Sequence, residues 1–510
     1  MTDPNTPQGP PAGDVPPLGG WAGGPPPGSQ LPSRPPVVGS ARPPTELAPA
    51  WTPPNPDGPP KRPSNGALLA ALAAVVAVIL LAGGLAIVLS NGADEPRVNA
   101  QPESPTTSTP VASPTTTPGG LGEVIGEDPS PSTSPGPSTS APATTTPADP
   151  DPDTEATVDD VISFIEETRG AEFTTRPDVQ FQDDAAFEEG LLKDFDEQQE
   201  ELEDEQVLFH ALGMLPADVD LAETMKSALG LGVVGYYDPE TEEMVVRGTS
   251  LTPYVRTVLA HELTHALDDQ LFDLDRAELD DVTDETGYGF TVLTEGSASY
   301  VEQAYREQMS AADQARASTE ELQAGSDPAI FDIPFVILAL LTAPYSSGLE
   351  LVDSIVDEGG GVDAIPDAFD EPPTTSEETM TPSKYLDHEG SVKVPTPSPD
   401  SGAEEVTSGV FGQIGFTALL STGITLDDPA PGTEGWSGDS YVTWNDESDL
   451  ACAKIDTVMD SAGDAEDLKA ALDNWAAGAP VDATISVSGD EVNLTSCATE
   501  ASTGGGSPGV

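Results

Sequence analysis

The segment Thr257–Asp268 constrains this chain more than any other, because it predicts a helix that carries a metal site. It reads Thr-Val-Leu-Ala-His-Glu-Leu-Thr-His-Ala-Leu-Asp and contains the pattern H-E-x-x-H. At 3.6 residues per turn, His261 and His265 lie one above the other on one helical face. Two imidazoles at this spacing can bind one Zn²⁺, and Glu262 beside them can act on a water molecule there. The chain has only four histidines, so this pairing is improbable by chance.

The remainder of this helix has the pattern of an element with one buried face. Apolar residues recur at helical spacing, roughly opposite the two histidines: Val255, Leu259, Leu263, Ala266 and Leu267. Thr252 is a candidate N-cap, and Pro253 suits the first helical position. We therefore expect a helix that buries one side in the core and keeps a separate side for the metal.

The first 89 residues predict a disordered segment followed by a membrane anchor. Of the first 60 residues, 20 are proline, so we expect residues 1–66 to be a disordered Pro/Gly-rich segment. Residues 67–89 form an uncharged run rich in Ala, Val and Leu. This length suffices for one transmembrane helix. The run is too long and too far from Met1 for a cleaved signal peptide.

Charges on the two sides of this run predict its orientation. Cations precede it and acids follow it closely: Arg34, Arg42, Lys61, Arg62, then Asp94 and Glu95. Because Lys and Arg stay on the cytoplasmic side of a membrane, we expect a single-pass signal anchor in the cell membrane. The N-terminus would then be cytoplasmic and the C-terminal part extracytoplasmic.

The part beyond the anchor divides into a linker, a domain and a tail. Residues 90–155 are rich in Pro, Thr and Ser, a composition that holds a domain away from a membrane without folding itself. We expect the folded domain at 156–500, which is long enough to bury an ample core. Residues 501–510 are rich in Gly and Ser and predict a flexible tail.

The acidic balance narrows the classes of partner. The formal net charge is −71, and most of the acidic residues follow residue 155. The negative electrostatic potential of such a domain repels phosphate groups, which argues against nucleic acid as a partner. It is compatible with cationic peptides or with Ca²⁺, and it could equally serve solubility alone.

The only two cysteines, Cys452 and Cys497, both lie in the expected exterior domain. An oxidising compartment favours a structural disulfide between them. A loop of this size would stabilise the fold by about 4 kcal/mol in the chain-entropy model. Neither cysteine is near the H-E-x-x-H pattern in sequence, so we expect the two cysteines to form a structural disulfide and not to act as metal ligands.

A catalytic zinc needs a third protein ligand and one open position. With so few histidines, this ligand is a carboxylate, His210 or His388. The strongest candidate is Glu295, thirty residues after the second histidine of the pattern, on a second predicted helix. A Glu at this distance resembles the arrangement of gluzincin metallopeptidases. Glu302 and the carboxylates of residues 268–284 remain alternatives. If Glu295 is the ligand, Glu302→Gln should leave zinc binding nearly unchanged.

The resemblance extends over about residues 230–475. Five motifs occur in order: Gly235–Thr241, Leu259–Leu267, Thr294–Gly296, Pro372–Tyr385 and Gly435–Tyr441. Together they resemble a group of uncharacterised bacterial, notably actinobacterial, membrane-anchored H-E-x-x-H proteins with an E-G-x-A second motif. The resemblance implies a zincin-like domain with zinc bound by the two histidines and Glu295.

The chain departs from gluzincins at a position that supports the metal ligands. An acidic residue often stands four positions after the third ligand and orients the first histidine, but here this position is Ser299. Ligating imidazoles usually donate their free N–H to a carboxylate or a carbonyl. The orientation must therefore come from elsewhere, and Asp268, Asp269 and Asp439 are candidates.

Residues that could stabilise a transition state are less evident. A His that often precedes the proline of the Pro-x-Lys-Tyr segment in the related bacterial proteins is Thr381 here, and no cationic stabiliser stands out. We consider His388, Tyr385 and Tyr441 as candidates, although each is more commonly a packing or hydrogen-bonding residue.

Hydrophobic patterns predict an α+β domain in which helices dominate. Strands are expected at 233–247, as a hairpin, and at 440–444 and 484–494; helices are expected at 333–341, 412–420 and 468–475. Residues 156–229 are helix-rich and acidic. The edge of the hairpin, just before the H-E-x-x-H helix, could pair with an extended peptide.

These patterns lead to the hypothesis of a membrane-anchored, extracytoplasmic zinc-dependent endopeptidase. Glu262 would act as general base on water activated by one Zn²⁺, and the substrate would be a protein or peptide in the cell envelope. A catalytically inactive, metalloprotease-like scaffold or binding protein of the envelope is an alternative. A Ca²⁺-dependent acidic surface module is another.

Overall fold

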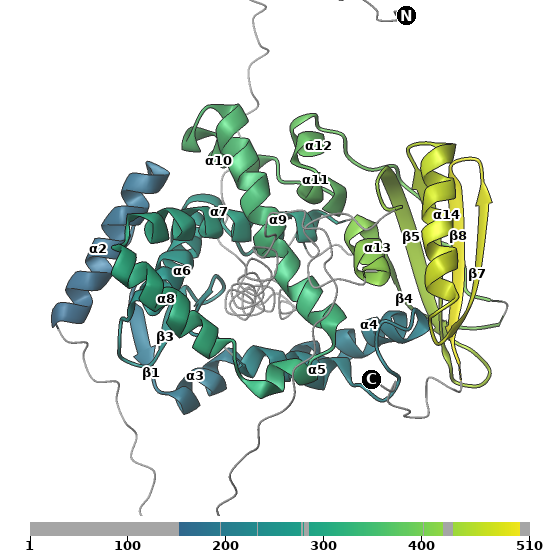
Figure 1. Cartoon of the computed structure of the whole chain (residues 1–510), viewed down its shortest axis with the longest axis horizontal. Helices are drawn as coiled ribbons and strands as arrows, with labels where there is room; N and C mark the ends of the chain where they lie inside the picture. Colours follow the sequence, from purple (N-terminus) through teal and green to yellow (C-terminus); the bar gives the residue numbers. More distant parts are fainter. Residues whose placement is uncertain are drawn as a thin grey trace, which may run out of the picture. The chain divides into compact units, whose positions relative to one another are not determined.

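The computed structural model describes residues 152–499, apart from 194, 232, 277–278, 280–284, 401 and 422–431 (Figure 1). The expected segment 1–66, the expected transmembrane helix 67–89, almost all of the linker 90–155 and the tail 501–510 lie outside the described residues. Within them, the protein is a mixture of helix and sheet in which helices predominate, in agreement with the sequence.

Helices make up most of the described chain. Their bounds are α2 (Pro152–Arg169), α3 (Asp184–Leu191), α4 (Gln199–Ala211), α5 (Leu221–Gly230), α6 (Pro253–Phe272), α7 (Thr286–Gln308), α8 (Ala311–Ala324), α9 (Phe335–Gly359), α10 (Ile365–Asp370), α11 (Ser376–Met380), α12 (Pro382–Leu386), α13 (Gly412–Leu420) and α14 (Ala462–Ala476). Short 3₁₀ helices are η1 (Phe195–Gln198), η3 (Pro328–Asp332) and η4 (Val362–Ala364). Side chains that accept from the first turn cap several of these elements: Asp183, Asp220, Thr252, Ser310, Asp327, Thr375 and Ser461.

A small sheet precedes α6 and contains the predicted hairpin. Strands β2 (Gly235–Asp238) and β3 (Glu243–Arg247) are antiparallel, while β1 (Val179–Gln182) runs parallel to β3. The strand order is β1-β3-β2. Among the described strands, β2 is therefore an edge of this sheet, and it also packs against α6.

A second, antiparallel sheet lies in the C-terminal part, in the order β4-β5-β6-β8-β7 (Figure 1). Its strands are β4 (Glu405–Gly409), β5 (Trp436–Asn445), β6 (Ala451–Met459), β7 (Val481–Ser488) and β8 (Glu491–Ala498). The single strand expected at 484–494 is in fact a hairpin, because Gly489 adopts a positive φ of 72° and turns the chain.

Cys452 of β6 and Cys497 of β8 are direct cross-strand partners in this sheet, and they form a disulfide. Trp444 packs against Cys452 in a small buried cluster. The disulfide therefore links two neighbouring strands, and its cysteines are separated by 45 positions in the sequence. Both cysteines are far in sequence from the helix that carries the H-E-x-x-H pattern.

The burial of α6 differs from the sequence expectation. The helix begins at Pro253 after the N-cap Thr252, as expected, but residues 257–268 are buried on every side and not on one stripe. The reason is tertiary: α6 packs against α2, α7, α8 and β2. The helix that carries both histidines is thus a central element of the core, a position that holds its side chains rigidly.

Helix α9 runs well beyond the nine-residue apolar run recognised in the sequence. Among the described helices, it is the one long and apolar enough to cross a membrane, and 56% of its apolar window is buried inside the protein. It packs along α7, and the contact contains Gly296 of α7 and Gly348 of α9. These contacts give α9 the role of a core helix.

Candidate metal centre

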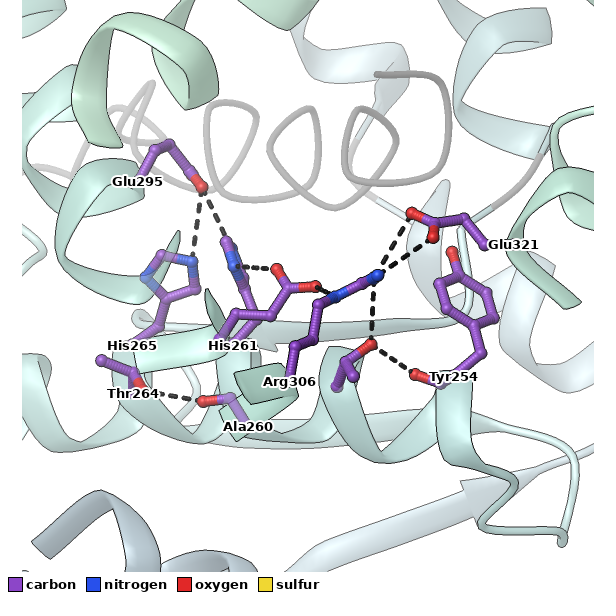
Figure 2. A network of polar contacts seen from close by, with 10 residues as sticks. Tyr254, Ala260, His261, Thr264, His265, Glu295, Arg306 and Glu321 are labelled. Atoms are coloured by element: carbon purple, nitrogen blue, oxygen red, sulfur yellow. Dashed lines mark hydrogen bonds and ion pairs between the residues drawn. The ribbon is translucent and has the colours of Figure 1, made fainter. Parts of the chain in front are cut away.

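Two histidines from α6 and one glutamate from α7 converge on a single point. His261 Nε2 lies 3.2 Å and His265 Nε2 lies 3.6 Å from the same oxygen, Glu295 Oε2. One ligand atom of each residue lies within 4.8 Å of the other two. Figure 2 shows the Glu295 carboxylate directed at both imidazoles. The cluster could hold a metal ion.

The local structure of α6 explains the position of the histidines. Their spacing of four residues places both rings on one face, where they pack edge to face with centroids 4.8 Å apart. Thr264, next to His265, turns its hydroxyl back to the Ala260 carbonyl at 2.7 Å (Figure 2). This leaves the two imidazoles as the groups that α6 directs toward Glu295.

The hydrogen-bonding state of His265 is a test of whether these residues fit a metal. Both ring nitrogens of this imidazole are buried, and neither makes a hydrogen bond among the described residues, since Glu295 Oε2 lies 3.6 Å from Nε2. Buried polar atoms in folded proteins are almost always paired. A metal ion accounts for the unpaired Nε2, because a neutral imidazole nitrogen is a ligand atom.

Charge at the cluster also favours a cation. Burial opposes protonation of His261, but the carboxylates of Glu295 and Glu302 outweigh burial and raise the pKa of this imidazole. Burial likewise opposes charge on Glu295, but His265 and His261 lower the pKa of its carboxyl. A positive charge among these groups is therefore stabilised by the carboxylates around it.

Glu262 adjoins the cluster and is held by the edge strand. Its Oε2 accepts the backbone N–H of Tyr237, in β2, at 3.1 Å. Burial raises the pKa of the Glu262 carboxyl to about 7. Gly235 lies against the side chain, since a Cβ there would be 3.5 Å from Glu262 Cγ. The carboxylate is thus fixed between β2 and the two histidines.

A carboxylate that the sequence did not assign to this role orients His261. Glu302 Oε2 lies 3.3 Å from His261 Nδ1, the nitrogen on the far side of the ring from Glu295. Glu302 follows Glu295 by seven residues, so two turns of α7 put both side chains on one face. The sequence-based expectation that Glu302→Gln leaves zinc binding nearly unchanged does not take this contact into account. The signal that could have revealed it is this two-turn spacing.

A further pair of residues holds Glu302 in turn. Arg306 Nε lies 3.1 Å from Glu302 Oε1, and the Arg306 guanidinium lies 3.1 Å from Glu321 of α8. The guanidinium also donates to the Thr257 hydroxyl at 3.3 Å. Figure 2 shows Arg306 directed at Glu321. A chain of alternating charges therefore extends from His261 through α7 to α8.

Two of the three acids that the sequence suggested as supports for the histidines have other partners. Asp268 forms a buried ion pair with Arg169 of α2 at 2.6 Å and accepts from the Ser297 hydroxyl at 2.6 Å. Asp269 accepts from the Tyr237 hydroxyl at 2.6 Å. These carboxylates join α6 to α2, α7 and β2.

The third, Asp439, lies in β5 and caps the first turn of α13. Its carboxylate accepts the backbone N–H groups of Phe411 and Gly412 at 2.7 and 2.8 Å. It also accepts from the Trp436 indole at 2.8 Å. The expectation that one of these three acids orients a histidine is therefore wrong, since Glu302 makes that contact.

The structure does not bring the nominated transition-state stabilisers to the cluster. Tyr385 is buried, but its hydroxyl donates to the Glu371 carbonyl at 2.9 Å. His388 is exposed, with a positive φ of 55°. Tyr441 lies in β5 and packs with the core of the C-terminal sheet. Each makes its contacts elsewhere in the described chain.

A tyrosine that no sequence motif singles out lies at the cluster instead. Tyr345, in α9, stacks on the His261 ring with centroids 5.7 Å apart and planes at 22°. It comes 80 positions after His265 in the chain, within an apolar helix. No spacing rule connects it to the H-E-x-x-H pattern, so only the packing of α9 on α7 reveals it.

Comparison with known proteins adds no further constraint. No protein-family model, curated protein or solved structure matches this chain.

Proposed function

We propose that the protein is a membrane-anchored, extracytoplasmic zinc-dependent endopeptidase with a zincin-like, gluzincin-type domain. The observation that carries this proposal is the convergence of His261, His265 and Glu295 beside Glu262. Two imidazoles and one carboxylate are a ligand set of catalytic zinc, and three protein ligands leave one coordination position open. A closed structural site would instead use four protein ligands.

The chemistry divides between the metal and the chain. A bound Zn²⁺ supplies a Lewis acid that acidifies water and polarises a carbonyl group. Glu262 accepts one proton of the attacking water as the oxygen forms a bond with the carbonyl carbon. Glu262 then delivers this proton to the amide nitrogen as the C–N bond breaks. The products are a carboxyl group and an amine, and Glu262 returns to its starting state.

The position of β2 suggests how a peptide is aligned. This strand is a sheet edge among the described strands, and it contacts Glu262 through the Tyr237 N–H. An extended peptide that pairs with an edge strand gains main-chain hydrogen bonds without a sequence requirement. Its scissile bond would then pass close to Glu262 and the ligands. A protein or peptide of the cell envelope is the proposed substrate class.

The expected location rests on the sequence. The uncharged run 67–89 and the cations that precede it support a single-pass anchor with a cytoplasmic N-terminus. The disulfide between Cys452 and Cys497 is in keeping with an oxidising compartment outside the cytoplasm.

An inactive scaffold is the alternative, and one observation counts against it. The sequence features that motivate it are Ser299, which leaves the usual support of the first histidine missing, Thr381, and the absence of an evident cationic stabiliser. Glu302 provides a carboxylate at His261 Nδ1 by another route. The support of the first histidine that Ser299 leaves missing is therefore supplied by Glu302.

The test combines metal analysis and cleavage. The full-length chain should hold one zinc per molecule and cleave members of a synthetic peptide library, as followed by mass spectrometry. Glu262→Gln should keep the zinc and lose cleavage, because it removes only the proton acceptor. Cleavage that survives Glu262→Gln, or a folded chain that takes up no zinc, would contradict the proposal.

A further inference from the structure

Helix α8 contacts the core through two side chains of opposite character. Of its 14 residues, the buried ones are Ala317 and Glu321, and Glu321 is only 3% exposed. Ala317 packs in a small apolar cluster with Tyr254 and Val258 of α6. A buried carboxylate destabilises a fold unless an opposite charge and hydrogen bonds satisfy it. The attachment of α8 to the core therefore depends on the partner of Glu321.

Arg306 is this partner, and its guanidinium links three helices. Nη1 and Nη2 lie 3.1 and 3.3 Å from the two oxygens of Glu321, the bidentate geometry that a planar guanidinium favours. Nε lies 3.1 Å from Glu302 Oε1, and Nη2 donates to the Thr257 hydroxyl at 3.3 Å. Thr257 precedes His261 on α6 by four residues, which is about one turn. Arg306 therefore joins α8 to α7 and to the turn of α6 that precedes His261.

The contact with Arg306 fixes one end of the Glu302 carboxylate. The other oxygen, Oε2, lies 3.3 Å from His261 Nδ1, and Glu302 is 9% exposed. A carboxylate that is bound at both oxygens cannot rotate without the loss of a charged contact. Figure 2 shows Arg306 between His261 and Glu321. The orientation of His261 thus depends on a carboxylate that α8 holds in place through Arg306.

We propose that Arg306 and Glu321 are positioning residues of the metal centre, which hold Glu302 against His261 so that the imidazole presents Nε2 to the metal. This inference rests on the proposed zinc-binding function and extends the site to α8, a helix that supplies none of the three ligands. Groups that orient a ligating histidine strengthen its binding to the metal. Zinc affinity should therefore depend on two side chains that are not ligands.

A purely structural role of Arg306 makes a different prediction. In that case its loss would weaken the fold, and any effect on zinc affinity would be the same whether or not the Glu302 carboxylate is present. A positioning role requires Glu302 as the intermediary. The effect of Arg306 on zinc affinity should then vanish once Glu302 has been replaced, because residues that act through one contact are not additive.

The experiment is a double-mutant cycle on zinc affinity in the full-length chain, measured by chelator competition. Its members are the wild type, Glu302→Gln, Arg306→Gln and the double variant; Glu321→Gln, alone and combined with Glu302→Gln, forms a second cycle. Arg316→Gln is the matched control, because Arg316 lies on α8 and forms an exposed ion pair with Glu320. The visible spectrum of the cobalt-loaded chain and the thermal midpoint of the metal-free chain are recorded for each variant.

For Arg306→Gln we expect zinc affinity to fall about tenfold, the lower end of the range for groups that orient a ligating histidine. In the Glu302→Gln background the same substitution should change zinc affinity by less than about twofold. Glu321→Gln should give a smaller loss that vanishes in the same background, since Arg306 keeps its contact with Glu302. The cobalt absorption bands should shift in Arg306→Gln and stay unchanged in Arg316→Gln.

Failure of this inference is distinct from failure of the proposed function. Wild-type zinc affinity in Arg306→Gln, cobalt bands that do not move, an equal loss in Arg316→Gln, or the same loss in both Glu302 backgrounds overturns the inference and leaves the function standing. If Arg306→Gln does not fold, the second cycle decides by the same criteria, because Glu321→Gln removes one buried charge and keeps the pair of Arg306 with Glu302. A folded wild type that binds no zinc overturns both.

Discussion

Replacement of Glu302 by glutamine tests whether the carboxylate beside His261 supports metal binding. From sequence spacing, Glu302→Gln should leave zinc binding nearly unchanged. In the structure, Glu302 Oε2 lies 3.3 Å from His261 Nδ1 and its other oxygen contacts Arg306 at 3.1 Å. The substitution keeps the size of the side chain and removes its charge. We therefore expect weaker zinc binding with little change in the fold.

The magnitude follows from the position of the contact. Removal of a group that orients a metal-ligating histidine typically weakens metal binding about 10- to 100-fold, or about 1.4 to 2.8 kcal/mol. The expected loss from Glu302→Gln is of this size, because the amide fills the same space beside Nδ1 but no longer supplies a negative charge. Glu295→Gln should cost more, since it changes a direct ligand.

The assay is competition for zinc between the full-length chain and a chromophoric chelator at constant pH and salt. Glu307→Gln is the matched control, because Glu307 lies on the same helix and is exposed. It should change zinc affinity by no more than about twofold, since an exposed charge is screened. Equal affinities for the Glu302 and Glu307 variants would refute the assigned role of Glu302.

The remaining predictions concern the stability of the full-length chain, each measured by denaturant unfolding. Arg169→Met should lower the free energy of unfolding by about 3–5 kcal/mol, because it leaves the buried Asp268 carboxylate without its cation. Arg176→Met is the control, since its ion pairs are exposed, and it should lower the free energy of unfolding by about 1 kcal/mol or less. Equal losses for the two variants would contradict a stabilising role of the Arg169–Asp268 pair. Replacement of both Cys452 and Cys497 by Ala should lower the free energy of unfolding by about 4 kcal/mol, the loop entropy for 45 residues; an unchanged denaturation midpoint would show that the bond does not limit stability. Burial raises the pKa of Glu285 to about 8, above its unfolded value of about 4.3, so its contribution is full at acidic pH and is lost as the pH rises toward 8. Glu285→Gln should therefore gain stability relative to the wild type between about pH 5 and 8, and a difference that stays flat across this range would argue against a buried, protonated Glu285.

The parts of the site that sequence could predict are those governed by local geometry. His261 and His265 share a face because four residues make about one helical turn. Thr252 and Pro253 begin the helix for reasons that act within one turn. The hairpin before the helix is likewise a short-range signal. Glu295 required the resemblance to a known arrangement in addition to its spacing.

The parts that sequence could not predict depend on packing between distant elements. Tyr345 reaches His261 because α9 crosses α7 at Gly296 and Gly348, a contact between residues more than fifty positions apart. The all-round burial of α6 arises from neighbours on every side. The apolar stripe of α6 packs in one cluster with α2, the small sheet and α7, and the sequence pattern does not show what covers the other faces of the helix.

Side-chain partners of the acidic residues were the least predictable feature. In a chain with 89 acidic residues, composition cannot select the one that supports a histidine. Asp268 and Asp269 follow the H-E-x-x-H pattern closely, but they point to α2 and β2. Glu302 contacts His261 because Glu295 and Glu302 lie on the same face of α7, and this face packs against α6.

The central claim is that one zinc ion binds to His261, His265 and Glu295. Anomalous diffraction at the zinc absorption edge, from crystals of the zinc-loaded full-length protein, tests it most directly. We predict one strong peak at about 2.0–2.1 Å from a nitrogen of each histidine and about 2.0–2.2 Å from a Glu295 oxygen. A peak at other residues, or a zinc held by both histidines with Glu295 more than about 6 Å away, would contradict the claim.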